Sequence, residues 1–227
     1  MNAHLLDRPI WSALAGGHAP LAQGGPLARR YAAEIVPFAA ARDAGAGALR
    51  ALAALVVPSE TVVLVEADDI VLPDALSPVS VAEAVQMIAE APLPPPDDPR
   101  IAPLTAADAA EMLALATLTR PGPFSLRALD LGRFWGIRQD GRLVAMAGER
   151  LRQPGFTELS GVCSHPDLRG RGLGRALSLF VTAQIRARGD IPYLHAYAGN
   201  RAAIGVYETI GFRRRGRMQV MVARRVD

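Results

Sequence analysis

A strand, a glycine-rich turn and a helix are predicted in succession over residues 162–177, which read VCSHPDLRGRGLGRAL. The first N–H groups of a helix have no partner within the helix, and together with the helix dipole they attract an anion. Glycines place no Cβ between these N–H groups and a phosphate, and arginines add positive charge. The residues expected to contact the anion are Arg169, Gly170, Arg171, Gly172, Leu173, Gly174 and Arg175.

The turn alone does not identify the anion, because an ordinary strand-to-helix turn with solvated arginines has the same pattern. A Rossmann dinucleotide site requires the spacing G-x-G-x-x-G and an acidic residue at the end of the next strand. Here the glycine spacing differs, and Asp190 precedes the next predicted strand instead of ending it. We therefore exclude the Rossmann site.

A second motif follows in the next strand–helix unit. The pattern N-x-x-A-x-x-x-Y-x-x-x-G-F is matched by Asn200, Ala203, Tyr207, Gly211 and Phe212. In the turn, the pattern [Arg/Gln]-x-x-Gly-x-[Gly/Ala] is matched by Arg169, Gly172 and Gly174. The two patterns in this order resemble the GNAT superfamily of N-acetyltransferases over about residues 100–227. Residues 156–166, FTELSGVCSHP, are most similar to its glycine N-acyltransferase-like branch.

The resemblance implies acetyl-CoA as cosubstrate, with its diphosphate in the turn and no metal. It also implies that the strand before the turn bulges and separates from its neighbour, so that the pantetheine arm pairs with the exposed backbone of Val162, Cys163 and Ser164. Asn200 and Ala203 would contact this arm from the other side of the gap.

The pattern of apolar residues after residue 100 predicts a mixed α/β sheet flanked by helices. Strands are expected over residues 101–104, 133–139, 142–152, 156–164, 191–198 and 217–223, and helices over residues 105–118, 172–188 and 200–210. In the first part of the chain we expect a helix over 41–57, a strand over 61–67, and a short helix over 80–89 with Ser80 as its cap.

Residues 91–100, APLPPPDDPR, form the predicted boundary, because five prolines in ten residues fit neither a helix nor a central strand. We expect a smaller α/β unit over residues 1–98 and a GNAT domain over 99–227. The first holds 5 arginines and 12 acidic residues, the second 20 and 10. This asymmetry suggests two units, of which the second binds an anion.

The first unit contains a weak echo of the anion turn. Arg42, Gly45 and Gly47 fit the same pattern before a predicted helix, which suggests a degenerate duplicate of the GNAT half. Asp43 lies inside this turn, and no tyrosine lies near Ser77, where a duplicate would place it. We therefore expect this unit to bind no CoA, and to cover the acceptor cleft or form a homodimer surface.

Two catalytic roles can be assigned to residues. Glu158 lies eleven residues before Arg169 on the predicted strand, the offset of the catalytic glutamate in histone-acetylating members, and is the candidate base. The alternative is an exposed carboxylate paired with Arg150 or Arg152, and Glu149 is the reserve candidate. The resemblance makes Tyr207 the candidate acid that protonates the CoA thiolate; otherwise it would be a tyrosine packed on the sheet.

Strand alternation places Glu158, Ser160 and Val162 on one face and Cys163 on the other. As a nucleophile, Cys163 would need a lowered pKa and a base such as His165, and a small buried strand residue is the better interpretation.

The acceptor is expected near residues 120–133, with Phe124, Arg133 and Trp135 as wall residues and an arginine available for an acceptor carboxylate. The arginines over 213–217 lack interleaved aromatic residues, so they predict a solvated turn or contacts to the CoA 3′-phosphate instead of nucleic-acid binding.

Composition excludes several other chemistries. All 25 basic residues are arginine, so the chain has no lysine that could form a Schiff base or attach pyridoxal phosphate. One cysteine and four histidines offer no metal-binding spacing and no internal disulfide. The sequence shows no membrane span and no secretory signal, which makes the cytoplasm the expected location.

These observations predict an N-acetyltransferase that moves an acetyl group from acetyl-CoA to the primary amine of a small molecule by direct attack. The alternative is a non-catalytic module that senses acyl-CoA and signals through the acidic first unit.

Overall fold

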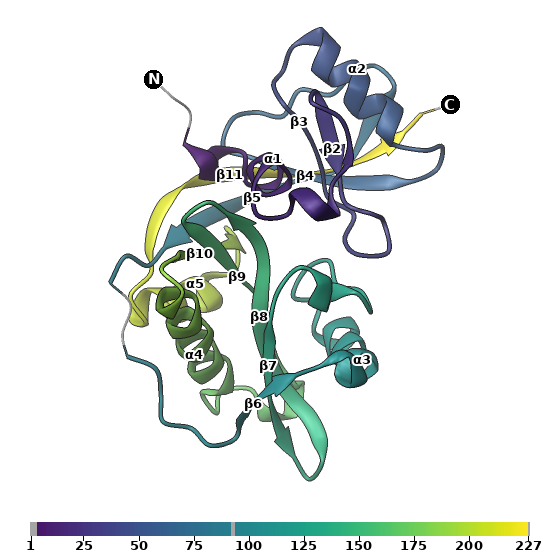
Figure 1. The fold of residues 1–227 in the computed structure, drawn as a ribbon. Helices are drawn as coiled ribbons and strands as arrows, with labels where there is room; N and C mark the ends of the chain where they lie inside the picture. Colours follow the sequence, from purple (N-terminus) through teal and green to yellow (C-terminus); the bar gives the residue numbers. More distant parts are fainter. Residues whose placement is uncertain (1–3, 92–93, 227) are drawn as a thin grey trace.

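The computed structural model describes residues 4–91 and 94–226, and one long mixed sheet runs through it with helices on both faces (Figure 1). The helices are α1 (Pro9–Ala15), α2 (Ala46–Leu55), α3 (Ala109–Thr119), α4 (Leu173–Ala187) and α5 (Arg201–Thr209). The strands are β1 (Gln23–Gly24), β2 (Ala28–Arg30), β3 (Ala39–Ala41), β4 (Thr61–Glu66), β5 (Leu76–Ile88), β6 (Ile101–Leu104), β7 (Phe134–Gln139), β8 (Arg142–Gln153), β9 (Phe156–Ser164), β10 (Ile191–Tyr197) and β11 (Arg213–Arg225).

Strands from both sides of the proline-rich linker alternate in the long sheet, whose order is β4-β11-β5-β10-β9-β8-β7-β6. β5 lies between β10 and β11 and is antiparallel to both. β11 in turn lies between β5 and β4. Figure 1 shows β5 and β11 running together from the part that holds α4 to the part that holds α2. Each part of the chain therefore supplies a strand that the other part needs.

The two parts also repeat one arrangement. In the second part β9 is followed by α4 and then by β10, which is parallel to β9. In the first part β3 is followed by α2 and β4, and Phe38, just before β3, forms a parallel bridge to Val63 in β4. Each part ends in a long strand that pairs with the other part, β5 with β10 and β11 with β4. This arrangement agrees with a duplicated unit whose last strands have been exchanged.

The helix predicted over residues 80–89 is wrong, because this segment belongs to β5. Between Ala84 and Ile88 only Val85 is not buried. Strands flank β5 on both sides and side chains cover both of its faces here, so its apolar residues do not alternate with polar ones. The last strand begins at Arg213 instead of residue 217. The boundary predicted near residue 98 does not coincide with any break in the sheet.

Different segments cover the two faces of the sheet. α4 and α5 pack on one face over Leu159 and Leu194. On the opposite face, residues 4–40 form a second core with Tyr193 and Met218, and Leu6, Ile10 and Phe38 lie in it. α3 covers β7–β9 beside that second core. Sequence patterns left residues 1–40 undefined, and the described part of this segment, residues 4–40, covers the sheet face that carries Glu158.

Ion pairs between the two parts account for much of the charge asymmetry. The arginine cluster near the start of β11 faces acidic residues of the first part: Arg213 pairs with Glu90, Arg215 with Asp7, and Arg217 with Glu83. Arg214 pairs with Glu208 of α5. For these arginines the sequence predicted a solvated turn or contacts to the CoA 3′-phosphate, and it did not predict these ion pairs.

The exchange of β5 and β11 leads to a prediction about folding. A fragment of residues 99–227 lacks β5, so the edges of β10 and β11 lose their backbone partners. We expect this fragment alone to show no cooperative urea transition by circular dichroism, and addition of residues 1–98 to restore one.

The control is the full chain cleaved at a protease site inserted into the linker, which should stay associated and unfold cooperatively. A fragment of residues 99–227 that unfolds cooperatively by itself would show that the second part is an independent domain.

Candidate functional site

The predicted anion turn has the backbone conformation that glycine permits. Gly170 and Gly172 both have φ of 75°, in the left-handed region where other residues are strained. A Cβ built on either glycine would meet no atom within 4 Å. Packing therefore does not require glycine at these two positions, whereas the backbone conformation does.

The first helical hydrogen bond of α4 runs from the Ala176 N–H to the Gly172 carbonyl, at 2.9 Å. The N–H groups of Leu173, Gly174 and Arg175 therefore lie at the helix start without an acceptor inside the helix. The Leu173 side chain is buried in the core, so only its backbone faces the turn. A Cβ on Gly174 would lie 3.7 Å from both Val162 and Ser164, which shows how closely α4 starts against the end of β9.

Exposed arginines surround these donors, namely Arg169, Arg171 and Arg175. The turn therefore combines backbone N–H groups, open space and positive charge, the features that a diphosphate requires. The residues present fit the diphosphate of a coenzyme.

A gap opens between β9 and β10 beside this turn. The two strands pair only from Ile191↔Phe156 to Tyr193↔Glu158. Beyond these pairs, β9 continues to pair with β8 as far as Ser164, and β10 with β5 as far as Tyr197. The facing backbone edges of β9 and β10 are separated there, as the sequence analysis predicts. An extended chain with amide groups can pair with such edges.

A bulge in β9 reverses which face its last residues occupy. Gly161 has φ of 63°, and the register with β8 shifts between Ser160 and Cys163. Val162 therefore packs towards α4, and Cys163 lies in the core under α3. The predicted grouping of Val162 with Glu158 on one face is wrong, because regular alternation ends at the bulge.

Cys163 is buried, and this burial raises the pKa of its thiol to about 11. A thiol in this environment stays protonated at neutral pH and is a poor nucleophile. Its side chain points away from α4, so only its backbone is suited to contact the pantetheine arm.

The second motif lies on α5. Asn200 caps this helix, because its Oδ1 accepts a hydrogen bond from the Ala203 N–H at 3.1 Å. Tyr207 packs against the core under α4 and α5 and against the Phe212 ring. Burial, with a smaller contribution from the nearby Cys163, raises the pKa of Tyr207 to about 12. Its phenol is therefore protonated at neutral pH.

The predicted base, Glu158, is fully buried in an ion pair. Arg150 donates from Nε to Oε2 at 2.9 Å and from Nη2 to Oε1 at 2.7 Å, and His195 Nδ1 lies 2.8 Å from Oε1. Burial alone would raise the pKa of Glu158, but Arg150 and His195 outweigh it and hold the pKa at about 2. Arg150 is one of the two partners that the sequence suggested for Glu158, but the pair is buried and not exposed. A carboxyl group with so low a pKa does not fit the role of a base.

The reserve candidate, Glu149, is also buried, and Arg188 at the end of α4 donates to it at 2.6 Å. Sequence patterns did not identify His195 and Gln86 as partners in this region. The sequence signal that could have identified them is a polar residue within each of two apolar segments, His195 in β10 and Gln86 in β5.

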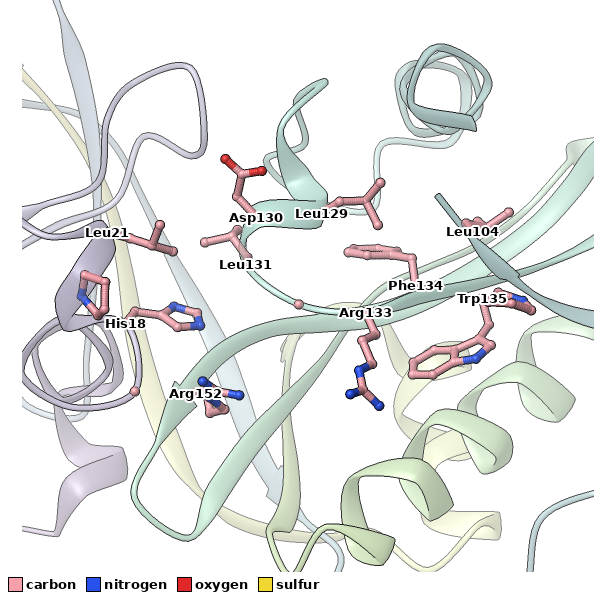
Figure 2. A pocket seen from close by; sticks show the side chains of 14 residues that line it. His18, Leu21, Leu104, Leu129, Asp130, Leu131, Arg133, Phe134, Trp135 and Arg152 are labelled. Carbon is pink, nitrogen blue, oxygen red and sulfur yellow. The ribbon is translucent and has the colours of Figure 1, made fainter. Parts of the chain in front are cut away.

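A cavity of about 470 Å³ lies where β7 begins. Figure 2 shows Leu129 and Phe134 towards α3, with Arg133 and Trp135 on the side of α4. Phe134 also borders the bulge, because its ring would lie 2.8 Å from a Cβ on Gly161. Phe124, the third predicted wall residue, does not line the cavity but packs edge-to-face on Phe134.

No group of three or more His, Cys, Asp or Glu side chains is placed to hold a metal ion within residues 4–91 and 94–226. In the same part of the chain, no helix combines the length and apolar character needed to cross a membrane.

Comparisons with known proteins identify the family. A family model described as FR47-like protein matches residues 134–222. A crystal structure of a GNAT-family protein from Novosphingobium aromaticivorans, assigned as an acetyltransferase, is 43% identical and covers 99% of this chain and 100% of its own, with a TM-score of 0.93. A GCN5-related N-acetyltransferase from Kribbella flavida, 18% identical with a TM-score of 0.63, covers 96% of this chain and 94% of its own and shares the fold.

Two curated relatives match shorter segments. Mycothiol acetyltransferase from Thermobispora bispora is 48% identical over 50 residues, which are 22% of this chain and 17% of the relative. N-alpha-acetyltransferase RimI from Mycobacterium tuberculosis is 39% identical over 84 residues, 36% of this chain and 52% of the relative. The chain thus spans about half or less of these two proteins. The full-length match to the Novosphingobium structure, together with the anion turn and the parted strands, shows that this chain belongs to the GNAT family of acetyltransferases.

Proposed function

We propose that this chain transfers the acetyl group of acetyl-CoA to the primary amine of a small molecule by direct attack. The observation that carries the proposal is the gap between β9 and β10 beside the anion turn, with Val162 and Tyr207 packed on the core under α4 and α5. Phe134 borders the β9 bulge and also lines the acceptor cavity. Backbone groups of residues 162–164 would pair with the pantetheine arm. The side-chain NH2 group of Asn200, whose Oδ1 caps α5, would contact the arm from the other side.

The cavity favours a small acceptor. Its volume of about 470 Å³ lies in the range typical of small-molecule sites. The names of the two curated relatives mention mycothiol in one case and an N-alpha group in the other, so they do not decide between acceptor classes. Arg133 and Arg152 line the cavity and could bind a carboxylate of the acceptor.

In the proposed reaction, the lone pair of a neutral amine attacks the thioester carbonyl and the C–S bond breaks. Tyr207 donates its phenolic proton to the departing thiolate and regains a proton from solvent. The raised pKa of Tyr207, about 12, keeps this proton on the phenol until the thiolate forms. The nitrogen releases its extra proton to water.

We assign Glu158 a role other than the predicted base. A carboxylate with a pKa of about 2 binds a proton too weakly to deprotonate an ammonium group. Its contacts with Arg150 on β8 and His195 on β10 instead hold these strands together at the point where β9 and β10 part. Glu158 thus acts as a positioning residue in this proposal.

The first prediction from the proposed function concerns the acid. Tyr207→Phe should lower kcat about 10²- to 10⁴-fold and leave the Kd for acetyl-CoA nearly unchanged, because only the proton donor is lost. Thiol release measured with a panel of amines, with mass detection of the acetylated product, tests both the reaction and the acceptor class. Tyr197→Phe is the control, because Tyr197 is exposed at the end of β10.

Full activity of Tyr207→Phe would remove the assigned acid. Binding of acetyl-CoA without turnover of any amine would favour the acyl-CoA sensor over the enzyme.

The second prediction concerns the anion turn. Gly172→Ala and Gly189→Ala introduce a Cβ at two positions with φ of 75° and 88° and with open space around them. Both should lower the free energy of unfolding by about 1–2 kcal/mol, since the left-handed conformation disfavours alanine. Only Gly172→Ala should weaken acetyl-CoA binding, because Gly189 lies after the other end of α4. Equal binding by the two variants in calorimetry would place the diphosphate elsewhere.

The third prediction concerns pH. The pKa of Glu158 is about 2 in the folded protein and 4.5 as the ordinary value. Its ion pair therefore stabilises the fold above about pH 4.5, and this stabilisation is lost as the pH falls towards 2. We expect the stability difference between the wild type and Glu158→Gln, from urea midpoints, to shrink over this interval. The other acidic residues titrate in both proteins, so the stability difference between them reports on Glu158 alone. A stability difference that stays constant between pH 4.5 and 2 would contradict the ion pair.

A further inference from the structure

A chain of hydrogen bonds crosses the sheet face that residues 4–40 cover. It begins with the pair of Arg150 on β8 and Glu158 on β9, continues to His195 on β10, and reaches Gln86 on β5, whose Nε2 lies 3.0 Å from His195 Nε2. Arg215 on β11 donates from Nη1 to Gln86 Oε1 at 2.8 Å. These five residues lie on five strands that are neighbours in the sheet.

The backbone places the members of this chain beside one another. His195 and Gln86 are directly opposite in the register of β10 and β5. Glu158 is opposite Tyr193, two residues from His195 on the same face. The register of β11 shifts between Arg214 and Gly216, and this bulge turns Arg215 towards Gln86.

Residues from both parts of the chain fix the two ends of the Gln86 amide. Arg215 can only donate, so the oxygen Oε1 must face it. The carbonyl of Leu6 can only accept, and it lies 2.8 Å from Nε2. Arg215 is itself held by Asp7, whose Oδ1 accepts at 2.6 Å. Because Gln86 is fully buried, no water competes for these contacts.

The orientation of Gln86 determines which nitrogen of His195 carries a proton. Nε2 of Gln86 donates to Nε2 of His195, which must therefore be unprotonated. The proton lies on Nδ1, which donates to Glu158. A proton on Nε2 would face an N–H group across 3.0 Å.

We propose that Gln86 is a positioning residue of the transfer site: its amide holds His195 as the neutral Nδ1–H tautomer, and His195 with Arg150 then fixes Glu158 at the point where β9 and β10 part. Gln86, Leu6 and Asp7 all belong to the first part of the chain. The proposal thus gives that part a function in the site of the second part. Only the activity arm of the test below rests on the proposed function.

The test uses the full chain with Gln86→Met, which keeps the length of the side chain and removes its donor, and Gln86→Glu, which replaces the donor by an acceptor. The control is Gln219→Met, because Gln219 on β11 accepts from the Ile70 N–H and donates to Asp69, both outside this chain of residues. Nitrogen-15 NMR of the histidine rings reports protonation at each nitrogen. It depends on no acceptor or turnover.

In the wild type we expect His195 to be protonated at Nδ1 and to accept a hydrogen bond at Nε2. Gln86→Met should remove the signature of that hydrogen bond, and Gln86→Glu should protonate Nε2 as well. Once an acceptor is identified, Gln86→Met should lower kcat about 3- to 10-fold, the effect of losing one hydrogen bond, and leave the Kd for acetyl-CoA unchanged. Gln219→Met should change neither the histidine signals nor kcat.

Two results would overturn the proposal. One is a wild-type His195 protonated at Nε2, which would exclude the donation from Gln86 whether or not the protein has activity. The other is a Gln86→Met variant with a lower Tm but unchanged kcat below its unfolding temperature, which would make Gln86 structural only. Loss of all turnover in the wild type contradicts the proposed function and leaves the NMR arm intact.

Discussion

The antiparallel pairing of β5 with β11 and β10 is the interaction on which the rest of the structure depends. β10 can part from β9 because its other edge is fully paired with β5, from Tyr193↔Ile88 to Tyr197↔Ala84. Without β5 the separated part of β10 would lack backbone partners on both sides. The gap in the second part of the chain is therefore supported by a strand from the first.

The same pairing explains how charge is distributed. An acidic first part and a basic second part suggest two units with separate tasks, of which one binds an anion. In the structure, Arg213, Arg215 and Arg217 on β11 face acidic residues of the first part across the exchanged strands. The arginines of the anion turn, in contrast, are exposed. The charge asymmetry of this sequence thus reflects contacts between the two parts as well as the exposed arginines of the turn.

Local signals predict the parts of the site that local geometry determines. The glycines of the turn and the start of α4 follow from residues within one strand–helix unit. The bulge at Gly161 moves Val162 and Cys163 to faces that regular alternation does not predict. Pairs that join distant segments are also missed, because the segment around Gln86 has the composition of a short helix and becomes a strand only between β10 and β11.

The turn before α2 in the first part matches the sequence pattern of the anion turn, but its own side chains occupy it. Before α2, the Asp43 carboxylate accepts from the Gly45 N–H at 2.9 Å and pairs with Arg42, so the position of an anion is taken by a side chain. Four acidic residues and one arginine line the cavity beside it, namely Asp43, Glu66, Asp68, Asp69 and Arg8, so its net negative charge disfavours a diphosphate. The strands of this part pair with those of the second part, β4 with β11 and β5 with β10. The first part therefore contributes β5 to the sheet that holds the gap, together with the side chains of Gln86 and Asp7, which contact His195 and Arg215.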